Sequence, residues 1–447
     1  MFLERAENIR DVLKYLRTFN NKTIVIHIDD EIINSALFLH HIKDISLIHQ
    51  AGLKIVIVPG ARETINEVLK NSAIKTSFHN GIRITSENAI PLIKMAAFDT
   101  ANRVMTVLAG EHKTAIIGNW VKARGKGVLD GFDYAYSGEI SDVDTQVIQK
   151  VLDTKCIPIF PCIGWSQTGK PYNISSVSLA SEIAIALKAE KLLYIGNNIN
   201  ICNNNFDLPK NIQLNENGTV WAMTIEQANE VLSKNGTVFE SGSVCECTTM
   251  QLLKHCAKSC ENGVSRSHIL NGTIDGTVLQ ELFSDVGQGS MVYQNHYAGI
   301  RAMLIEDIDN VLNLMHPFIE TGTILPRSAE VLQAAYEDYI VYEIDGDIKA
   351  CCALHMYIET DNGVQAEIAG IVVDSNYSGM GIGPKMVAYL LERAKTMNAK
   401  SIFILTTQTA DWFESLGFTE DTVESLPSKR KQLWNQKRNS KLFRLSL

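Results

Sequence analysis

Short, almost continuously apolar segments recur along the first part of the chain, and segments with helical spacing separate them. The apolar segments are rich in β-branched residues and cover residues 23–28, 54–59, 114–118, 157–160 and 192–196. Segments of this kind are typical of strands buried on both faces, as in a parallel sheet. Because amphipathic segments such as 36–51 and 178–188 lie between them, the alternation predicts a doubly wound α/β domain.

A second pattern begins near Ile300. It predicts a strand from this residue, followed by a helix that starts near Glu306 and Asp307. The next elements that the pattern predicts are a strand, a helix and a strand over residues 365–373, 384–399 and 401–407. We therefore expect two α/β domains, one over residues 1–295 and one over residues 296–447.

Composition and charge narrow the possible functions. The chain has 447 residues, a net charge of −9 and a pI of about 5.7, so no overall positive potential attracts it to nucleic acid or to an anionic membrane. No segment reaches the roughly 18 uncharged apolar residues of a membrane span, and the first residues do not resemble a secretory signal. We expect a cytoplasmic protein that binds neither nucleic acid nor membrane.

The nine cysteines do not predict a disulfide framework, because their number is odd and no secretion signal is evident. Cys245, Cys247, Cys256 and Cys260 lie close together in sequence, which raises the question of a zinc site. Their spacings differ from those of a zinc ribbon or finger. We therefore expect no metal, and we expect these thiols to be buried or incidental.

The clearest chemical signal follows the predicted strand over 365–373. Ser378-Gly-Met-Gly-Ile-Gly383 leads directly into a predicted helix. Glycines let backbone N–H groups approach a ligand, and a helix N-terminus adds positive dipole, so this turn suits a pyrophosphate. Taken alone, a glycine-rich loop is explained equally well as an ordinary strand–helix turn.

The segments around this loop resemble the GCN5-related N-acetyltransferase (GNAT) family. A strand, the glycine loop, a helix, another strand and then Trp412-Phe-Glu-Ser-Leu-Gly-Phe418 follow in the order typical of that family. The resemblance implies a site for acetyl-CoA as co-substrate. Its residues in this chain would be Ile371, Val372 and Val373 for pantetheine, and Ser378, Gly379, Gly381 and Gly383 for pyrophosphate. Family members usually have Arg or Gln where Ser378 stands, so one phosphate contact is missing here.

The basic C-terminal tail suggests the substrate. Residues 429–447 contain seven Lys and Arg and no acidic residue, although a solvated charged end is the simpler interpretation. From Arg438 to Leu445 the sequence alternates like a strand, which would place Arg438 and Ser440 on one face. A guanidinium and a hydroxyl on one face could hold a substrate carboxylate, and Arg327 could hold a second one.

Over nearly its whole length the chain resembles the bacterial two-domain N-acetylglutamate synthases. The matching segments are 322–328, 367–373, 405–407, 412–418 and 426–441. The resemblance implies transfer of an acetyl group from acetyl-CoA to L-glutamate, the entry to arginine biosynthesis. It also implies that Arg327, Arg438 and Ser440 hold glutamate and that Glu367 is the general base.

A physical argument supports Glu367 independently. An ammonium group cannot attack a thioester, so a base must first remove a proton. A carboxylate flanked by apolar residues on a central strand loses water, which favours its uptake of a proton, whereas a solvated strand glutamate is the alternative. Strand N–H groups near Ile371 and Val372 would stabilise the oxyanion. Thr406 or Thr407 could return a proton to the thiolate, or could be present only for their β-propensity.

The N-terminal domain resembles the amino-acid kinase family, with the acetylglutamate kinases as the best match, which implies a three-layer α/β fold. The matching segments are 55–61, 80–85, 172–176, 263–270 and 279–289. Kinases of this family have Lys-x-Gly-Gly where this chain has His27-Ile-Asp-Asp30. The lysine that neutralises the transferred phosphate is missing and two carboxylates would repel phosphate, so we expect no phosphoryl transfer.

Related synthases and kinases bind arginine as a feedback effector in this domain. The matching positions are His268, Glu281, Gly287 and Gly289. A carboxylate near outward-pointing carbonyls suits a guanidinium, whereas a surface glutamate at a helix end is the alternative for Glu281. The resemblance also implies a homo-oligomer, in the form of a ring of subunits.

Three other functions remain open at this point. The acceptor could be another acidic amino acid, or the chain could be an arginine-sensing regulatory protein that only binds acetyl-CoA. An active acetylglutamate kinase is disfavoured by His27, Asp29 and Asp30.

Overall fold

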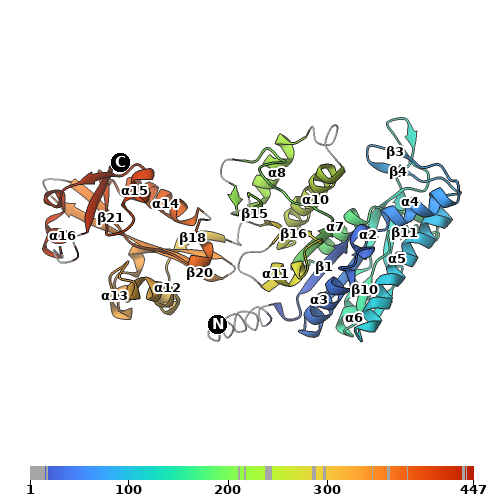
Figure 1. Cartoon of the computed structure of the whole chain (residues 1–447), viewed down its shortest axis with the longest axis horizontal. Helices are drawn as coiled ribbons and strands as arrows, with labels where there is room; N and C mark the ends of the chain where they lie inside the picture. The colour runs from blue at the N-terminus through green and yellow to red at the C-terminus, as the bar shows by residue number, and fades with distance from the viewer. Residues whose placement is uncertain are drawn as a thin grey trace. The chain divides into compact units, whose positions relative to one another are not determined.

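The chain forms two compact units, Met1–Gln294 and Asn295–Leu447, in a computed structural model (Figure 1). The model describes residues 16, 19–209, 212–215, 218–236, 244–283, 288–294, 298–344, 346–359, 363–379, 381–434, 438 and 440–447. Both units combine helices with sheets, so the predicted α/β class is confirmed. Among these residues, no helix is both long enough and apolar enough to span a membrane.

The first unit is built on a nine-stranded sheet with the order β14-β15-β17-β16-β13-β1-β2-β10-β5. Its strands are β1 (Thr23–Ile28), β2 (Lys54–Pro59), β5 (Ala115–Ile117), β10 (Ile157–Ile159), β13 (Lys191–Gly196), β14 (Gln213–Leu214), β15 (Val220–Thr224), β16 (Arg266–Asn271) and β17 (Ser290–Tyr293). The six strands from β16 to β5 are parallel to their neighbours. All five apolar segments noted in the sequence are strands of this sheet, as predicted.

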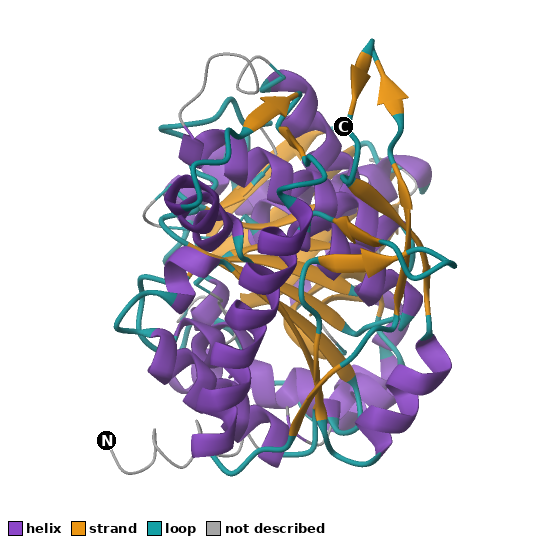
Figure 2. Cartoon of the chain, turned by 90° about the vertical axis from the view of Figure 1, so that its right-hand side faces the viewer, coloured by secondary structure: helices purple, strands orange, loops and turns teal. Residues whose placement is uncertain are grey.

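Helices cover both faces of this sheet, as Figure 2 shows. They are α2 (Asp30–Ile33), α3 (Phe38–Gln50), α4 (Arg62–Asn71), α5 (Ile90–Gly110), α6 (Thr145–Asp153), α7 (Ser176–Ala186), α8 (Ile225–Lys234), α10 (Val244–Glu261) and α11 (Thr277–Phe283). Side chains alternate between the two faces of a strand. In β1, Val25 packs in one core with α6, α7 and α10, whereas Ile24 and Ile26 pack in another core with α3, α5 and α11. The unit therefore has three layers.

A smaller sheet and two hairpins complete the first unit. The smaller sheet has the order β12-β11-β6-β9. Its strands are β6 (Val121–Gly125), β9 (Gly138–Val143), β11 (Ile163–Trp165) and β12 (Pro171–Asn173), and the hairpins pair β3 (Ser77–His79) with β4 (Ile82–Ile84) and β7 (Val128–Leu129) with β8 (Phe132–Asp133).

The second unit is built on a seven-stranded sheet with the order β18-β19-β20-β21-β22-β24-β23. Its strands are β18 (Ala298–Ala302), β19 (Tyr339–Ile344), β20 (Asp347–Glu359), β21 (Gly363–Val373), β22 (Ser401–Thr406), β23 (Thr419–Asp421) and β24 (Lys441–Ser446). Strands β21 and β22 are parallel, and the other neighbouring pairs are antiparallel. The parallel pair requires a crossover, which α14 supplies.

Helices pack against both faces of the second sheet. They are α12 (Ile308–Glu320), α13 (Ala329–Ala334), α14 (Ile382–Thr396), α15 (Ala410–Ser415) and α16 (Ser428–Gln432), with short 3₁₀ turns η1 (Ile305–Asp307), η2 (Tyr336–Asp338), η3 (Ser375–Tyr377) and η4 (Val423–Ser425). Val311 and Met315 of α12 and Leu332 of α13 share a core with Val341 of β19. Figure 1 shows α14 on the opposite face.

The strand predicted from Arg438 is wrong in its first residues. β24 begins at Lys441, so Arg438 and Ser440 precede the strand and do not share a strand face. Lys441 pairs with Thr406, the last residue of β22. β22 therefore ends where β24 begins.

Candidate functional site

Glu367 lies near the middle of β21 and is only 4% exposed, so it is not the solvated strand glutamate that the sequence allowed. Its carboxylate is held from two sides. The Nε of Arg430 donates to Oε1 at 3.0 Å and to Oε2 at 2.8 Å, and the hydroxyl of Tyr357 donates to Oε2 at 2.8 Å. Burial, together with the Glu367 carboxylate, raises the pKa of Tyr357, so this hydroxyl keeps its proton.

Arg430 and Tyr357 are functional candidates that the sequence did not reveal. Tyr357 is on β20 and lies opposite Gln365 of β21 in the strand register. Gln365 and Glu367 are two residues apart, so they lie on the same face of β21, next to Tyr357. Arg430 is on α16, within the tail that the sequence had singled out for its charge and for its resemblance to the synthases, but with no role for this residue. The basic Leu426–Lys441 segment was the available signal, but nothing in it distinguished Arg430 from its lysine neighbours.

Strands β21 and β22 part beside Glu367. Their register runs from Gln365–Ser401 to Ile368–Ile404 and ends there, although β21 continues to Val373. On its other edge β21 stays paired with β20 through Val373, with a bulge where Gly370 and Ile371 lie opposite Cys352. Among the residues that the structure describes, none therefore pairs as a strand with the β22 side of β21 over residues 369–373, where Ile371, Val372 and Val373 lie. Such an edge can pair with an extended ligand.

Arg327 reaches the bulge of β21. A side chain on Gly370, which has a φ of +59°, would meet Nη1 of Arg327 at 2.6 Å, so this guanidinium lies directly on the glycine backbone. The Nη1 atom is buried and has no hydrogen-bond partner among the described residues. A buried donor without a partner is costly unless a ligand binds it, and a carboxylate is the matching ligand.

A series of hydrogen bonds links Arg438, another expected substrate residue, to Thr406. Nη2 of Arg438 donates to the carbonyl of Thr323 at 2.8 Å and to that of Gly322 at 3.3 Å. The hydroxyl of Thr323 donates to the side chain of Gln408 at 3.4 Å, and the backbone N–H of Gln408 donates to Thr406 at 3.3 Å. Arg438 is therefore tied to the loop that leads to Arg327, and this loop is tied to the end of β22.

Of the two threonines at the end of β22, only Thr406 is built into a network. Thr406 is 9% exposed, and its hydroxyl accepts the backbone N–H of Thr409 at 3.0 Å and lies 2.7 Å from the hydroxyl of Thr409. Thr407 is exposed. Ser440 is partly buried next to the start of β24.

The glycine loop has the backbone geometry that a phosphate site needs. Gly379 and Gly381 have φ values of +81° and +73°, and an added side chain on either would meet no neighbouring atom. Gly381 is the N-cap of α14 and leaves the helix N-terminus without a side-chain cap. Gly383 packs against Trp412, whose ring would lie 3.1 Å from an added Cβ. Ser378 is exposed just before the loop.

In the first unit, Asp30 fills the place where a phosphate would bind. Its buried carboxylate accepts the backbone N–H groups of Glu63 at 2.6 Å and Thr64 at 3.0 Å. These groups belong to the first turn of α4, whose own N-cap, Ala61, supplies no side-chain cap. A helix N-terminus at the end of a parallel strand is a general anion site, and here a carboxylate of the same chain occupies it.

The neighbours of Asp30 are equally unsuited to phosphate. Burial lowers the pKa of His27 to about 3, so a neutral imidazole stands where the kinases have lysine, and its Nε2 lies 3.1 Å from the hydroxyl of Ser176. Asp29 caps α2 by accepting the N–H of Glu31 at 3.1 Å. Burial, then the nearby carboxylates of Asp30 and Glu31, raise the pKa of Asp29 to about 7.

The expected effector residues form a buried pair. Nδ1 of His268 donates to Oε1 of Glu281 at 2.5 Å, and the backbone N–H of Gly289 donates to Oε2 at 2.9 Å. Burial of Glu281 favours its neutral form, but these hydrogen bonds hold its pKa below the usual range, and burial lowers the pKa of His268. Glu281 is 7% exposed, so the surface interpretation is wrong. Gly287 lies outside the described residues.

Two of the four clustered cysteines lie in the interior. Cys256 and Cys260 are buried in the core of the first unit, and within the described ranges no group of three or more His, Cys, Asp or Glu could hold a metal ion.

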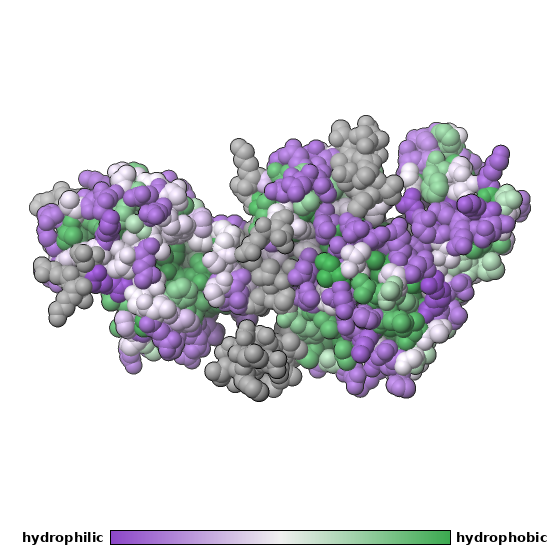
Figure 3. Space-filling view, viewed as in Figure 1, coloured by the Kyte–Doolittle hydropathy of each residue, from purple (hydrophilic) through white to green (hydrophobic). Residues whose placement is uncertain are grey.

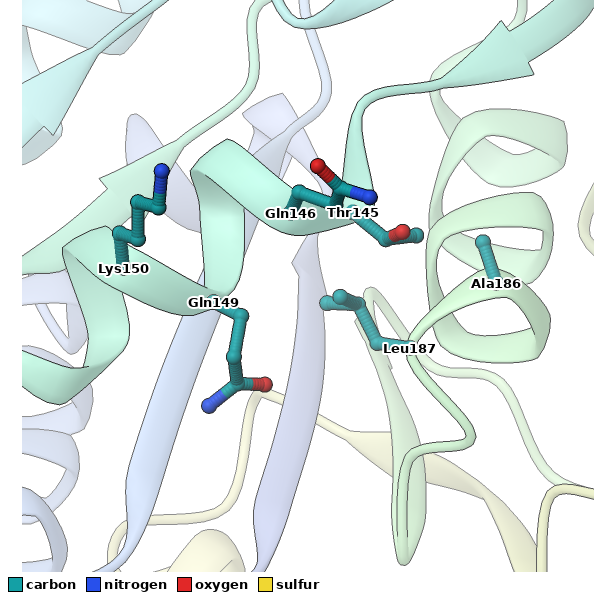
Figure 4. Close-up of a pocket in the computed structure, with 6 residues that line it drawn as sticks. All are labelled: Thr145, Gln146, Gln149, Lys150, Ala186 and Leu187. Carbon is teal, nitrogen blue, oxygen red and sulfur yellow. The ribbon is translucent and has the colours of Figure 1, made fainter.

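A surface depression of about 510 Å³ lies between α6 and α7 (Figure 4). The residues that line it are Thr145, Gln146, Gln149, Lys150, Ala186 and Leu187, none of which the sequence had suggested for a site. On the face in Figure 3, hydrophobic side chains form islands among hydrophilic ones.

Comparison with known proteins gives consistent matches over both units. Residues 22–271 match the amino acid kinase family, and residues 306–418 match the acetyltransferase (GNAT) family. The chain is 34% identical to an amino-acid acetyltransferase of Vibrio vulnificus (strain CMCP6), over 99% of this chain and 98% of that protein. It is 31% identical to the amino-acid acetyltransferase of Escherichia coli (strain K12), again over 99% and 98%.

Solved structures of N-acetylglutamate synthase from Neisseria gonorrhoeae are similar over 99% of both chains. The complex of that protein with coenzyme A and L-arginine superposes with a TM-score of 0.81 at 27% identity. Its complex with coenzyme A and N-acetyl-glutamate superposes with a TM-score of 0.59 at 28% identity.

The raised pKa of Asp29 gives a testable dependence of stability on pH. The folded chain keeps this proton up to about pH 7, whereas the unfolded chain loses it near pH 3.8, so the free energy of unfolding falls as pH rises between these values. Asp29→Asn can still cap α2 but cannot ionise. We expect its melting temperature, relative to the wild type, to rise by at least about 2 °C between pH 5 and pH 8.

Asp144→Asn, at the N-cap of α6, controls for replacing a carboxylate cap by an amide. Equal dependence of the melting temperature on pH in wild type and Asp29→Asn would contradict the assignment.

Proposed function

The chain belongs to the amino-acid acetyltransferases with the two-domain architecture of the N-acetylglutamate synthases, and we propose that Glu367, Arg327 and Arg438 carry out its acetylation of L-glutamate. The observation on which the proposal rests is the position of Glu367. It is a buried carboxylate on β21, just before the place where β21 and β22 part. A base in that position lies next to the free strand edge along which an acyl carrier can bind.

Acetyl-CoA fits the second unit in two places. The unpaired edge of β21 over Ile371, Val372 and Val373 offers backbone groups to the pantetheine arm. Ser378 and the loop of Gly379, Gly381 and Gly383 at the N-terminus of α14 suit the pyrophosphate, because the loop backbone is open and the helix end is uncapped. Acetyl-CoA supplies the activated acetyl group. Coenzyme A is bound in the Neisseria gonorrhoeae synthase, which supports this assignment.

L-Glutamate needs two cationic partners because it has two carboxylates. Arg327 has a buried Nη1 without a partner, and Arg438 lies in a turn tied to the loop that leads to Arg327. Ser440, two residues after Arg438, can add a hydroxyl. Bidentate or charge-assisted hydrogen bonds of this kind contribute about 1.5–3 kcal/mol each.

The reaction then requires two proton transfers. Glu367 takes a proton from the ammonium group of glutamate, and the free amine attacks the acetyl carbonyl. The new N–C bond forms, the C–S bond breaks and the sulfur leaves as a thiolate, and the second proton that the attacking nitrogen must lose passes to this thiolate. Backbone N–H groups of Ile371 and Val372 at the bulge stabilise the oxyanion between these steps. In the proposed reaction Thr406, at the end of β22, relays this proton to the thiolate, and Thr407 helps to orient the substrate.

Replacing the proposed base separates chemistry from binding. We expect Glu367→Gln to lower kcat by roughly 10²- to 10⁴-fold, because the amide cannot accept the proton. Coenzyme A binding, measured by calorimetry, should persist. Glu414→Gln, the same change at an exposed position on α15, is the matched control. Thiol release from acetyl-CoA with glutamate, other acidic amino acids and no acceptor measures the rate and the acceptor range.

Two outcomes would contradict the proposal in different ways. Full activity of Glu367→Gln would refute its role as base. An absence of thiol release by the wild type with glutamate would refute the function and leave an acetyl-CoA-binding regulator as the better description.

The contact between Arg327 and Gly370 gives a second test. Gly370→Ala places a methyl group where Nη1 of Arg327 lies, so the guanidinium must move. We expect the KM for glutamate to rise about tenfold or more, as for the loss of one charge-assisted hydrogen bond. Gly346→Ala has a comparable positive φ of +83° with open space around it, so it controls for backbone strain. An unchanged KM in Gly370→Ala would exclude Arg327 from glutamate binding.

We also propose that arginine binds the first unit near His268 and Glu281. The carboxylate of Glu281 suits a guanidinium, and the buried Nε2 of His268, which has no partner in the described part of the chain, can accept a hydrogen bond. Gly289 leaves no room for a side chain, since an added Cβ would lie 2.4 Å from the carbonyl of Ile269. L-Arginine is present in the similar Neisseria gonorrhoeae complex.

Calorimetric titration with L-arginine tests this site. We expect Glu281→Gln to weaken arginine binding by about 10- to 100-fold, because the charge of its carboxylate is lost. Glu230→Gln, at a partly exposed position on α8, is the control. Equal affinity of wild type and Glu281→Gln would place the effector elsewhere. Assays with and without arginine then establish whether the effector inhibits.

We also propose that the chain forms a homo-oligomer and is cytoplasmic. The family resemblance supports both proposals. Sedimentation measures the oligomeric state directly.

A further inference from the structure

The guanidinium of Arg430 forms hydrogen bonds to the rest of the described chain through only one of its three nitrogens, Nε. Its Nε contacts both oxygens of Glu367, at 3.0 and 2.8 Å. Within the described part of the chain, its two terminal nitrogens, Nη1 and Nη2, make no hydrogen bond. The Arg430 side chain is 16% exposed while that of Glu367 is 5% exposed, so part of the guanidinium remains open to solvent. Two adjacent N–H₂ groups form the fork that matches a carboxylate.

The oxygens of Glu367 are also used unequally. Oε2 accepts both Arg430 and Tyr357, whereas the bonds found for Oε1 come from Arg430 alone. A carboxylate oxygen has two acceptor positions, so Oε1 keeps one for the substrate proton. The ammonium group of the substrate must therefore come within hydrogen-bond distance of Oε1, next to Arg430.

We propose that Arg430 binds the α-carboxylate of the substrate through Nη1 and Nη2 while its Nε holds Glu367. The α-carboxylate and the ammonium group are bonded to the same carbon, so a substrate whose ammonium group reaches Oε1 brings its α-carboxylate beside the guanidinium. Arg327 and Arg438 keep the roles proposed above, one for each carboxylate, and Arg430 adds a second contact to the α-carboxylate. Arg430 is thereby a substrate-binding residue that recognises the α-amino acid part of the molecule.

This arrangement also explains why a cation lies against the base. Without Arg430, the α-carboxylate and Glu367 would be two adjacent negative charges in a poorly solvated site, which is unfavourable. The guanidinium between them compensates both. A bound α-carboxylate partly compensates the positive charge of Arg430. The guanidinium then stabilises the ionised form of Glu367 less, so Glu367 accepts a proton more readily once the substrate is bound. The inference rests on the proposed acetylation of an amino acid and assigns one more contact within it.

Amide analogues of the substrate test the assignment. Rates of thiol release are measured with L-glutamate, L-glutamine, which lacks the side-chain carboxylate, and the α-amide of L-glutamate, which lacks the α-carboxylate. For Arg430→Gln we expect kcat/KM to fall about 10- to 100-fold with both glutamate and glutamine, because both keep the α-carboxylate. With the α-amide the fall should be less than about threefold, since the contact is already missing.

Further variants keep the test decisive. Lys429→Gln removes one charge from an exposed position on the same helix and should behave as wild type. Arg430→Lys keeps the charge but has a single nitrogen, which cannot bind both carboxylates. We expect kcat/KM to fall with glutamate and glutamine but not with the α-amide, by a smaller factor than in Arg430→Gln. The test therefore does not depend on whether Arg430→Gln folds. If the α-amide turns over too slowly, its competitive inhibition constant gives the same comparison.

The possible failures are distinguishable. Equal losses with all three acceptors would reduce Arg430 to a structural partner of Glu367 and overturn the inference. Losses with glutamate and the α-amide but not with glutamine would move its contact to the side-chain carboxylate. If the wild type releases no thiol with any of the acceptors, the proposed function itself fails.

Discussion

The parting of β21 and β22 after Ile368 and Ile404 is the constraint on which the second unit depends. A bulge at Gly370 lets β21 remain paired with β20 while its other edge is released. Within the described ranges no strand pairs with the released edge, and a folded protein tolerates unpaired backbone groups only where a ligand or water satisfies them. Everything else in the site is arranged around that edge. Glu367 lies just before it, Arg327 rests on the bulge and the glycine loop begins after its last residue.

In the first unit, the chain itself satisfies a place where a ligand could bind. Six strands of its sheet are parallel, and helices cover both faces. At the end of β1, His27 is a neutral imidazole, and the carboxylate of Asp30 accepts the backbone donors of α4. The edge is stable because the chain now satisfies it internally, while the buried pair of His268 and Glu281 keeps a polar centre elsewhere in the same sheet.

What the sequence predicted followed from local pattern. The five strands of the first sheet, the α/β class and the strand–loop–helix order around Gly379 are all encoded within short segments, and the structure confirms them. The contacts of Glu367, in contrast, depend on residues that are distant in the sequence. Tyr357 reaches it through strand register, and Arg430 reaches it across 63 residues of chain. Alternation alone also misplaced Arg438 in a strand, since a strand needs a neighbour and β22 has ended by that point. The filled anion site of Asp30 likewise depends on two segments meeting in space.

The cap that Asp30 provides to α4 has a consequence for substitution at this position. Changing Asp30 to glycine would not by itself create a phosphate site, because it would first remove two hydrogen bonds from an otherwise uncapped helix end, each contributing about 1.5–3 kcal/mol. The binding capacity of this helix end and its stability are therefore coupled: a substitution that frees the two backbone donors for another anion also destabilises the first turn of α4.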